Sequence, residues 1–164
     1  MYLRMITKKA KWEQSLSMEI DALSSDLITG CLRTQGETLS LWRLESYEMV
    51  NEAIVALASN RELIQHLDYM IIPENKLSDY GFDIEFNCGH TPYEEFNKNH
   101  YDIIKLNYEK LGNVSQMILE LNKSDSNKIV RVYQDDVKLL LKKAINEGKI
   151  NEDKLKPKLK EALA

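Results

Sequence analysis

The sequence predicts an α+β fold: a single domain, residues 1–164, that is predominantly helical and surrounds a small antiparallel sheet of three strands. Helical periodicity covers more of the chain than strand periodicity does, and the candidate strands all lie between residues 38 and 87. Segregated runs of strands and helices are typical of this class. A chain of 164 residues fits one domain, and no linker-like stretch divides it.

The first elements alternate between helical and strand patterns. Apolar residues recur at helical spacing over residues 20–32, with Ser24 or Ser25 as the cap. Residues 38–45, TLSLWRLE, form a β-branched and aromatic run of strand length. An amphipathic helix follows over residues 50–57, where apolar side chains keep the i, i+3, i+4, i+7 spacing.

Two further strands precede a helical C-terminal part. LDYMIIP, residues 67–73, reads as a buried strand closed by Pro73. In FDIEFN, residues 82–87, apolar residues alternate with two carboxylates and an amide, which predicts one packed face and one anionic, solvated face. Apolar stripes over residues 111–121 and 137–145 predict two long helices.

Composition favours a cytoplasmic protein that does not contact membranes. The chain is 43% hydrophobic and 29% charged, which is ordinary for globular proteins. Its longest aliphatic run, residues 54–58, is too short to cross a bilayer, and the first residues lack the apolar core of a signal peptide. Cys31 and Cys88 are too few for a disulfide framework, so both are expected to be reduced thiols.

One stretch, CGHTPYEEFNKNHYD, raises the question of a metal site. Its candidate ligands are Cys88, His90 and His100, with an oxygen from Glu94 or Glu95. Zinc ligands normally come in short pairs such as C-x₂-C or H-x₃-H, and this spacing is absent. We therefore expect no metal and no other cofactor.

A helix start explains the same stretch better. Thr91 can act as the N-cap, Pro92 as the first helical residue and Glu94 as the third, which is the T-x-x-E capping box. Gly89 allows the backbone to turn ahead of this helix. The sequence therefore predicts a capped helix here.

Catalysis and nucleic-acid binding have less support. His100 stands two residues before Asp102 and could be an oriented general base, but no G-x-S-x-G, P-loop or dinucleotide glycine pattern is present. The enzyme alternative is a small metal-dependent or His-based hydrolase that uses His90, Glu94 and His100. The C-terminal lysines are interleaved with carboxylates and accompanied only by Arg131, which favours solvated helices over a nucleic-acid surface.

Charge is unevenly distributed along the chain. Residues 1–45 are neutral, with six basic and six acidic residues. Residues 46–102 hold three basic and eleven acidic residues, a net charge of −8, and residues 103–164 hold thirteen basic and nine acidic residues, a net charge of +4. The acidic segment is either a solvated face that aids solubility or a surface complementary to a basic partner.

Aromatic residues lie among these carboxylates, as they do in interface hot spots. Because positions 79, 83 and 85 belong to one strand region and positions 94 and 95 to the next element, a single anionic patch is geometrically possible. The candidate partner-binding residues are Asp79, Tyr80, Asp83, Glu85, Tyr93, Glu94, Glu95 and Asp102.

A small α+β chain with a concentrated acidic surface resembles the bacterial immunity proteins that neutralise toxins. LSLWRLESYEMVNEAIVALAS followed by LDYMIIP is similar to small bacterial proteins of this kind. The resemblance implies a one-to-one inhibitor of a basic toxin, such as a nuclease, whose cationic groove is occluded by carboxylates. The alternatives are the hydrolase and a non-catalytic structural or scaffold module.

Overall fold

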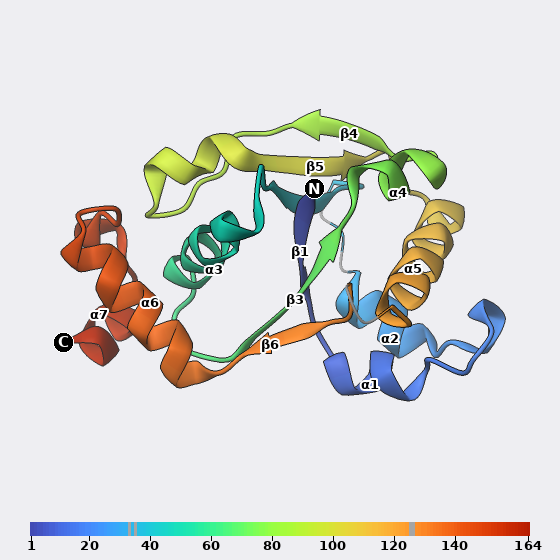
Figure 1. The fold of residues 1–164 in the computed structure, drawn as a ribbon, viewed down its shortest axis with the longest axis horizontal. Helices are drawn as coiled ribbons and strands as arrows, with labels where there is room; N and C mark the ends of the chain where they lie inside the picture. Colours follow the sequence, from blue (N-terminus) through green and yellow to red (C-terminus); the bar gives the residue numbers. More distant parts are fainter. Residues whose placement is uncertain (33, 35, 125–126) are drawn as a thin grey trace.

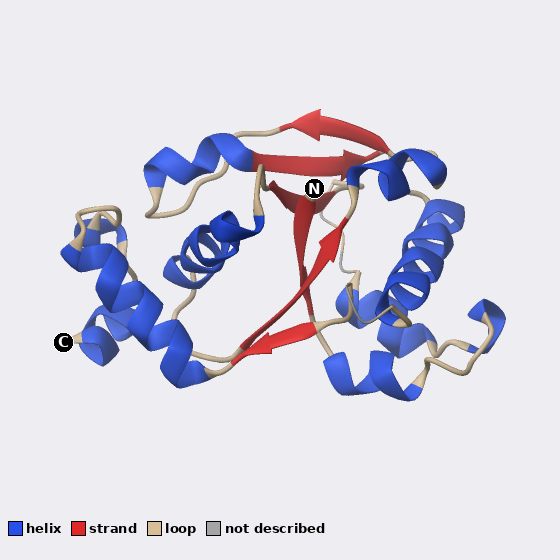
Figure 2. Ribbon diagram, in the orientation of Figure 1, coloured by secondary structure: helices blue, strands red, loops and turns tan. Residues whose placement is uncertain are grey.

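The described part of the protein forms a six-stranded antiparallel sheet with helices against both of its faces (Figures 1 and 2). The computed structural model describes residues 1–32, 34, 36–124 and 127–164. The strands lie in the order β4–β5–β2–β1–β3–β6, and each neighbouring pair is antiparallel. Their bounds are β1 (Tyr2–Ile6), β2 (Leu39–Arg43), β3 (Leu67–Ile72), β4 (Asp83–Phe86), β5 (His100–Ile104) and β6 (Val130–Val132).

The expectation of a small three-stranded sheet is therefore wrong, although the α+β class is confirmed. The predicted strands at 38–45, 67–73 and 82–87 are present as β2, β3 and β4, and β1, β5 and β6 join them. β1 shows no alternation of apolar and polar residues because both faces of the sheet are covered at its centre. β5 contains polar residues, and β6 has only three residues, so neither gives a clear strand pattern.

Most of the predicted helices are confirmed. The α-helices are α1 (Lys9–Gln14), α2 (Ser25–Cys31), α3 (Val50–Ser59), α4 (Glu74–Asp79), α5 (Tyr108–Asn122), α6 (Gln134–Asn146) and α7 (Pro157–Leu163), with short 3₁₀ helices η1 (Ile20–Ala22), η2 (Tyr47–Met49), η3 (Glu94–Asn99) and η4 (Glu152–Lys154). Ser24 caps α2, since its hydroxyl oxygen accepts a hydrogen bond from the Leu27 N–H at 3.2 Å. Among the described residues, no helix is long and apolar enough to cross a membrane.

The sheet separates two hydrophobic cores. On one face, α1, α2 and α5 pack through buried side chains such as Trp12, Leu27 and Met117. On the other face, α3, α6 and α7 contribute a second buried cluster that includes Ile54 and Leu141. Figure 1 shows the two groups of helices on opposite sides of β1 and β3. Each half of the protein therefore has its own apolar interior, with the central strands shared between them.

The Arg4 side chain bridges β1 and β2 where the two strands diverge and their pairing ends. These strands pair only through Tyr2 with Arg43 and Leu3 with Trp42. Beyond that point the Arg4 Nη1 donates a hydrogen bond to the carbonyl oxygen of Ser40 at 2.9 Å. Burial lowers the pKa of the Arg4 guanidinium. A side-chain donor thus satisfies a backbone carbonyl that the ladder leaves without a partner.

Candidate protein-binding surface

Most of the predicted partner-binding carboxylates lie along one margin of the sheet. In the part of the sheet that the structure describes, β4 is an edge strand that pairs only with β5, and α4 and η3 lie at its two ends (Figure 1). Asp79 ends α4, Asp83 and Glu85 are in β4, and Glu94 and Glu95 begin η3. All five are exposed. We call these five residues the acidic edge.

Two members of the acidic edge are neutralised within the chain. Asp83 forms ion pairs with Lys105 at 3.3 Å and with Lys110 at 3.6 Å. Glu94 forms an ion pair with Lys154 at 2.8 Å. Hydrogen bonds from these lysines hold the pKa values of both carboxyls below their usual range.

Asp79, Glu85 and Glu95 form no ion pair within the part of the chain that the structure describes. They are the members of the acidic edge whose charge remains open to a partner. The acidic edge therefore retains three uncompensated carboxylates, one in each of α4, β4 and η3.

The charge imbalance along the sequence is partly compensated by folding. Residues 46–102 are acidic and residues 103–164 are basic, and the fold brings the two segments together. The ion pairs between them are Lys76–Glu120, Lys105–Asp83, Lys110–Asp83, Arg131–Asp68, Lys149–Glu52 and Lys154–Glu94. Four of the eleven carboxylates of residues 46–102 therefore form tertiary ion pairs with the basic segment.

The two predicted interface tyrosines have structural contacts instead. Tyr93 is buried, and its hydroxyl donates a hydrogen bond to Glu52. Tyr80 donates a hydrogen bond from its hydroxyl to Glu120 Oε2 at 2.6 Å. The exposed aromatic residue at this margin is Phe86, at the end of β4, with 54% of its surface accessible. The alternation of the strand predicts a packed Phe86, and only its position at the sheet edge explains its exposure.

These tyrosines predict a loss of stability at alkaline pH. Burial, together with the hydrogen bond to Glu120, raises the pKa of Tyr80 to about 12. A pKa that is raised in the folded state means that the stabilisation is complete below pH 10 and is lost as the pH rises toward 12. We expect the free energy of unfolding, measured by urea denaturation, to fall over this interval, and to fall less in Tyr80→Phe. Tyr108→Phe is the control because Tyr108 is 93% exposed; a wild-type profile in Tyr80→Phe would contradict the prediction.

Beside the acidic edge, the sheet face of β2, β5 and β4 carries a polar groove. One part of it, of about 210 Å³, is lined by Thr38, Glu85, Phe86, Asn87, Asp102 and Ile104. Glu85 and Asp102 lie directly opposite each other in the β4–β5 ladder. Glu85 is exposed, whereas Asp102 is only 4% exposed. Asn87 Nδ2 donates a hydrogen bond to Asp102 Oδ2 at 2.6 Å. Asp102, which the sequence predicts as a partner-binding residue, is therefore a buried side chain that lines the groove.

The groove continues into an adjoining pocket of about 230 Å³ that contains the proposed metal ligands. Cys88, His90 and His100 line it, and Asn87 is shared with the first part. The His100 Nδ1 lies 2.6 Å from the carbonyl oxygen of Asn87, and its Nε2 lies 3.9 Å from Asp102 Oδ1. The backbone carbonyl, rather than the carboxylate, therefore orients His100.

The groove does not provide the geometry that the hydrolase alternative needs. Within the described residues, no group of three His, Cys, Asp or Glu side chains could hold a metal ion. Glu94 contacts Lys154 and Asn151 and does not line the pocket that His90 and His100 share. The three side chains that this alternative combines are thus not assembled into one site.

The predicted capping box at Thr91 does not form. η3 begins at Glu94, and the Thr91 hydroxyl donates a hydrogen bond to Asn97 Oδ1 at 2.8 Å. The Glu94 carboxylate is drawn away by its ion pair with Lys154. Gly89 is required for a different reason, because a Cβ there would lie 2.9 Å from Asn97 Oδ1 and 3.0 Å from the Trp42 ring. Thr91 therefore bonds within its own loop and Glu94 bonds to Lys154, in place of the predicted reciprocal cap.

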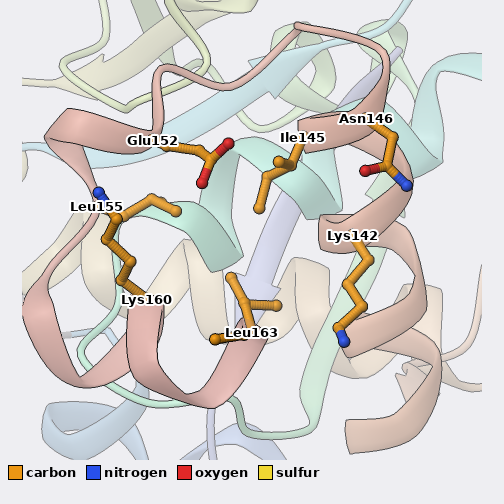
Figure 3. A pocket seen from close by; sticks show the side chains of 8 residues that line it. Lys142, Ile145, Asn146, Glu152, Leu155, Lys160 and Leu163 are labelled. Atoms are coloured by element: carbon orange, nitrogen blue, oxygen red, sulfur yellow. The ribbon is translucent and has the colours of Figure 1, made fainter.

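A second cavity, of about 370 Å³, lies among α6, η4 and α7 (Figure 3). Ile145, Leu155 and Leu163 supply apolar walls, and Lys142 and Lys160 lie at opposite margins of the cavity. Lys160 already pairs with Asp153 at 3.6 Å. The polar groups do not converge on one point, as they do in specific ligand sites, so this cavity does not define a function.

No protein-family model matches the chain, and no curated protein or solved structure matches it. The function must therefore be inferred from the geometry and charge of the acidic edge and the neighbouring groove.

Proposed function

We propose that the protein binds a basic protein partner through the acidic edge, and that it acts as an immunity protein that inhibits a basic bacterial toxin such as a nuclease. The observation that carries this proposal is the combination of open carboxylates and an exposed aromatic residue on a free sheet edge. Asp79, Glu85 and Glu95 supply the charge, and Phe86, which is 54% exposed, supplies an apolar anchor. Aromatic anchors surrounded by polar groups are typical of binding hot spots.

The edge strand offers a further means of recognition. Among the described strands, β5 is the one neighbour of β4, so one side of β4 has no strand partner. An edge strand presents N–H and C=O groups that can pair with a strand of another protein. Charged residues on an edge can also serve simply to prevent aggregation. An exposed phenylalanine on the same strand works against that purpose, which favours a binding role for the edge.

Electrostatic complementarity explains how such a surface would inhibit a nuclease. Carboxylates placed over a cationic groove occupy the positions that substrate phosphates would take. They also raise the association rate with a basic protein. Both effects weaken when salt screens the charges, so the affinity should depend strongly on ionic strength.

Reversing the charge of Asp79, Glu85 and Glu95 should weaken binding strongly. The variant Asp79→Lys/Glu85→Lys/Glu95→Lys is compared with Glu19→Lys/Glu62→Lys/Glu161→Lys, whose carboxylates are also exposed and which changes the net charge equally. Binding and inhibition are measured against a panel of purified basic bacterial nuclease-toxin domains at low and high salt. We expect a binding domain in the panel to lose affinity on the order of 100-fold for the first variant, because like-charge contacts cost several kcal/mol.

The control variant should bind that domain as the wild type does. Circular dichroism and thermal unfolding establish that both variants remain folded. Equal affinities of the two variants would contradict a role for the acidic edge, and a wild-type protein that inhibits no domain of the panel would contradict the toxin-inhibitor function.

A further inference from the structure

We infer that the part of the groove between Glu85 and Asp102 receives the guanidinium group of an arginine side chain from the partner. This inference rests on the proposed function, since it names the group that the partner would insert beside the acidic edge. The first observation is the pairing of the two carboxylates. They lie directly opposite each other on neighbouring antiparallel strands, where like charges destabilise a sheet.

The second observation is that Asp102 is buried and incompletely bonded. It is only 4% exposed and lines the groove. Asn87 donates a hydrogen bond to its Oδ2, but its Oδ1 has only His100 Nε2 nearby, at 3.9 Å, which is too long for a hydrogen bond. A buried carboxylate normally has its oxygens satisfied by donors or a cation. Asp102 Oδ1 therefore accepts no hydrogen bond from the described residues and can accept one from a partner.

Among the described residues, no lysine or arginine forms an ion pair with Glu85 or Asp102. The buried Arg4 guanidinium is attracted by the charge of Asp102, but its Nη1 donates a hydrogen bond to the Ser40 carbonyl oxygen and none to the carboxylate. Lys105 and Lys110 are directed to Asp83, the next residue on the same face of β4. Glu85 has no ion pair or hydrogen bond among the described residues. A cation that enters the groove would meet one exposed and one buried carboxylate at once.

The geometry favours arginine over lysine. Side chains directly opposite in an antiparallel pair have Cβ atoms about 5 Å apart, so the two carboxylates can each take one arm of a planar guanidinium. Arginine presents donors in a rigid fork that matches this arrangement, whereas a lysine ammonium is a single point of charge. The groove, at about 210 Å³, has room for the head group.

The test uses the whole chain and small probes of defined charge. Backbone amide resonances are followed by NMR during titration with N-acetyl-arginine-methylamide, with the uncharged citrulline analogue and with the lysine analogue. We expect the arginine probe to shift the amides of Glu85, Asn87 and Asp102, the citrulline probe to leave them unmoved, and the lysine probe to bind more weakly. Equal shifts from arginine and citrulline, or equal affinities for arginine and lysine, would overturn the inference.

Variants identify the carboxylates. Glu85→Gln should weaken binding of the arginine probe about tenfold or more, since a hydrogen bond to a charged group contributes about 1.5–3 kcal/mol. Asp83→Asn is the matched control because Asp83 is on the same strand and already paired with lysines, and it should leave the affinity unchanged. An unchanged affinity in Glu85→Gln, or an equal loss in both variants, would contradict the assignment. If the arginine probe did not bind but the protein still bound a toxin, the arginine site would be refuted and the proposed function would stand. If the arginine probe bound but the protein inhibited no toxin, the proposed function would be refuted and the arginine site would stand.

Discussion

Replacement of Trp12 by alanine is expected to lower the free energy of unfolding by about 3–5 kcal/mol, because truncating a buried aromatic residue removes its burial and leaves a cavity. Trp12 is completely buried, in the core that α1, α2 and α5 form against the sheet. α1 has only six residues and contributes Trp12 as its buried side chain. Loss of this side chain should therefore release α1 from the sheet.

Trp12→Phe should cost much less, about 1 kcal/mol. The indole Nε1 is buried and has no hydrogen-bond partner among the described residues. Phenylalanine removes this unsatisfied donor, and the gain offsets part of the lost packing. Urea denaturation followed by circular dichroism measures both values, with Leu139→Ala, at a residue 68% exposed, as a control expected within about 0.5 kcal/mol of the wild type. If Trp12→Phe destabilised the protein as much as Trp12→Ala, the role of the unpaired N–H would be refuted.

Replacement of Arg131 by methionine should also destabilise the protein strongly, by about 2–3 kcal/mol. Asp68 and Arg131 lie opposite each other where β6 pairs with β3. Arg131 Nε and Nη2 each donate a hydrogen bond of 2.8 Å to one oxygen of the Asp68 carboxylate. The Asp68 side chain is 5% exposed and the Arg131 side chain 35% exposed. Removal of the arginine therefore leaves the buried Asp68 carboxylate without these hydrogen bonds and with the weaker attraction of Arg61 alone among the described cations.

The opposite change should be milder. In Asp68→Asn the guanidinium can turn toward water, so we expect a loss of only about 1–2 kcal/mol. The double variant Asp68→Asn/Arg131→Met should be more stable than Arg131→Met alone, because it no longer contains the buried carboxylate. Chemical denaturation of the wild type and the three variants measures the free energies of unfolding that this double-mutant cycle requires. Equal losses for the two single variants would show that the asymmetry in burial does not govern this pair.

The sequence predicts the parts of the fold whose patterns are local. The strand at 67–73 and the helix at 50–57 were predictable because their apolar residues keep one period over several positions. β1 was missed because Tyr2 and Leu3 enter different cores on opposite faces of the sheet, which removes the alternation. Its central place in the sheet follows from pairing with distant strands, which a local pattern does not encode.

The sequence predicts that the candidate site is acidic, but it does not predict which of its carboxylates form ion pairs or lie opposite each other. The acidic character of residues 46–102 was evident in the sequence. The neutralisation of Asp83 and Glu94 was not, because their lysine partners belong to later parts of the chain. The opposition of Glu85 and Asp102 depends on the register of β4 against β5. The apolar and polar residues of β5 do not alternate as in a typical strand, so the sequence does not predict this strand or its register against β4.

The central position of β1 has a consequence for synthesis of the protein. Of the five strand pairs in the sheet, only β1–β2 and β4–β5 join consecutive strands. β1 ends at Ile6, and its partner β3 begins at Leu67. A ribosome that adds 5–20 residues per second needs roughly 3–12 s to make the intervening segment. During this interval β1 can pair with β2 alone, through Tyr2 and Leu3, so the rest of this apolar strand lacks a partner and is exposed to aggregation until β3 emerges.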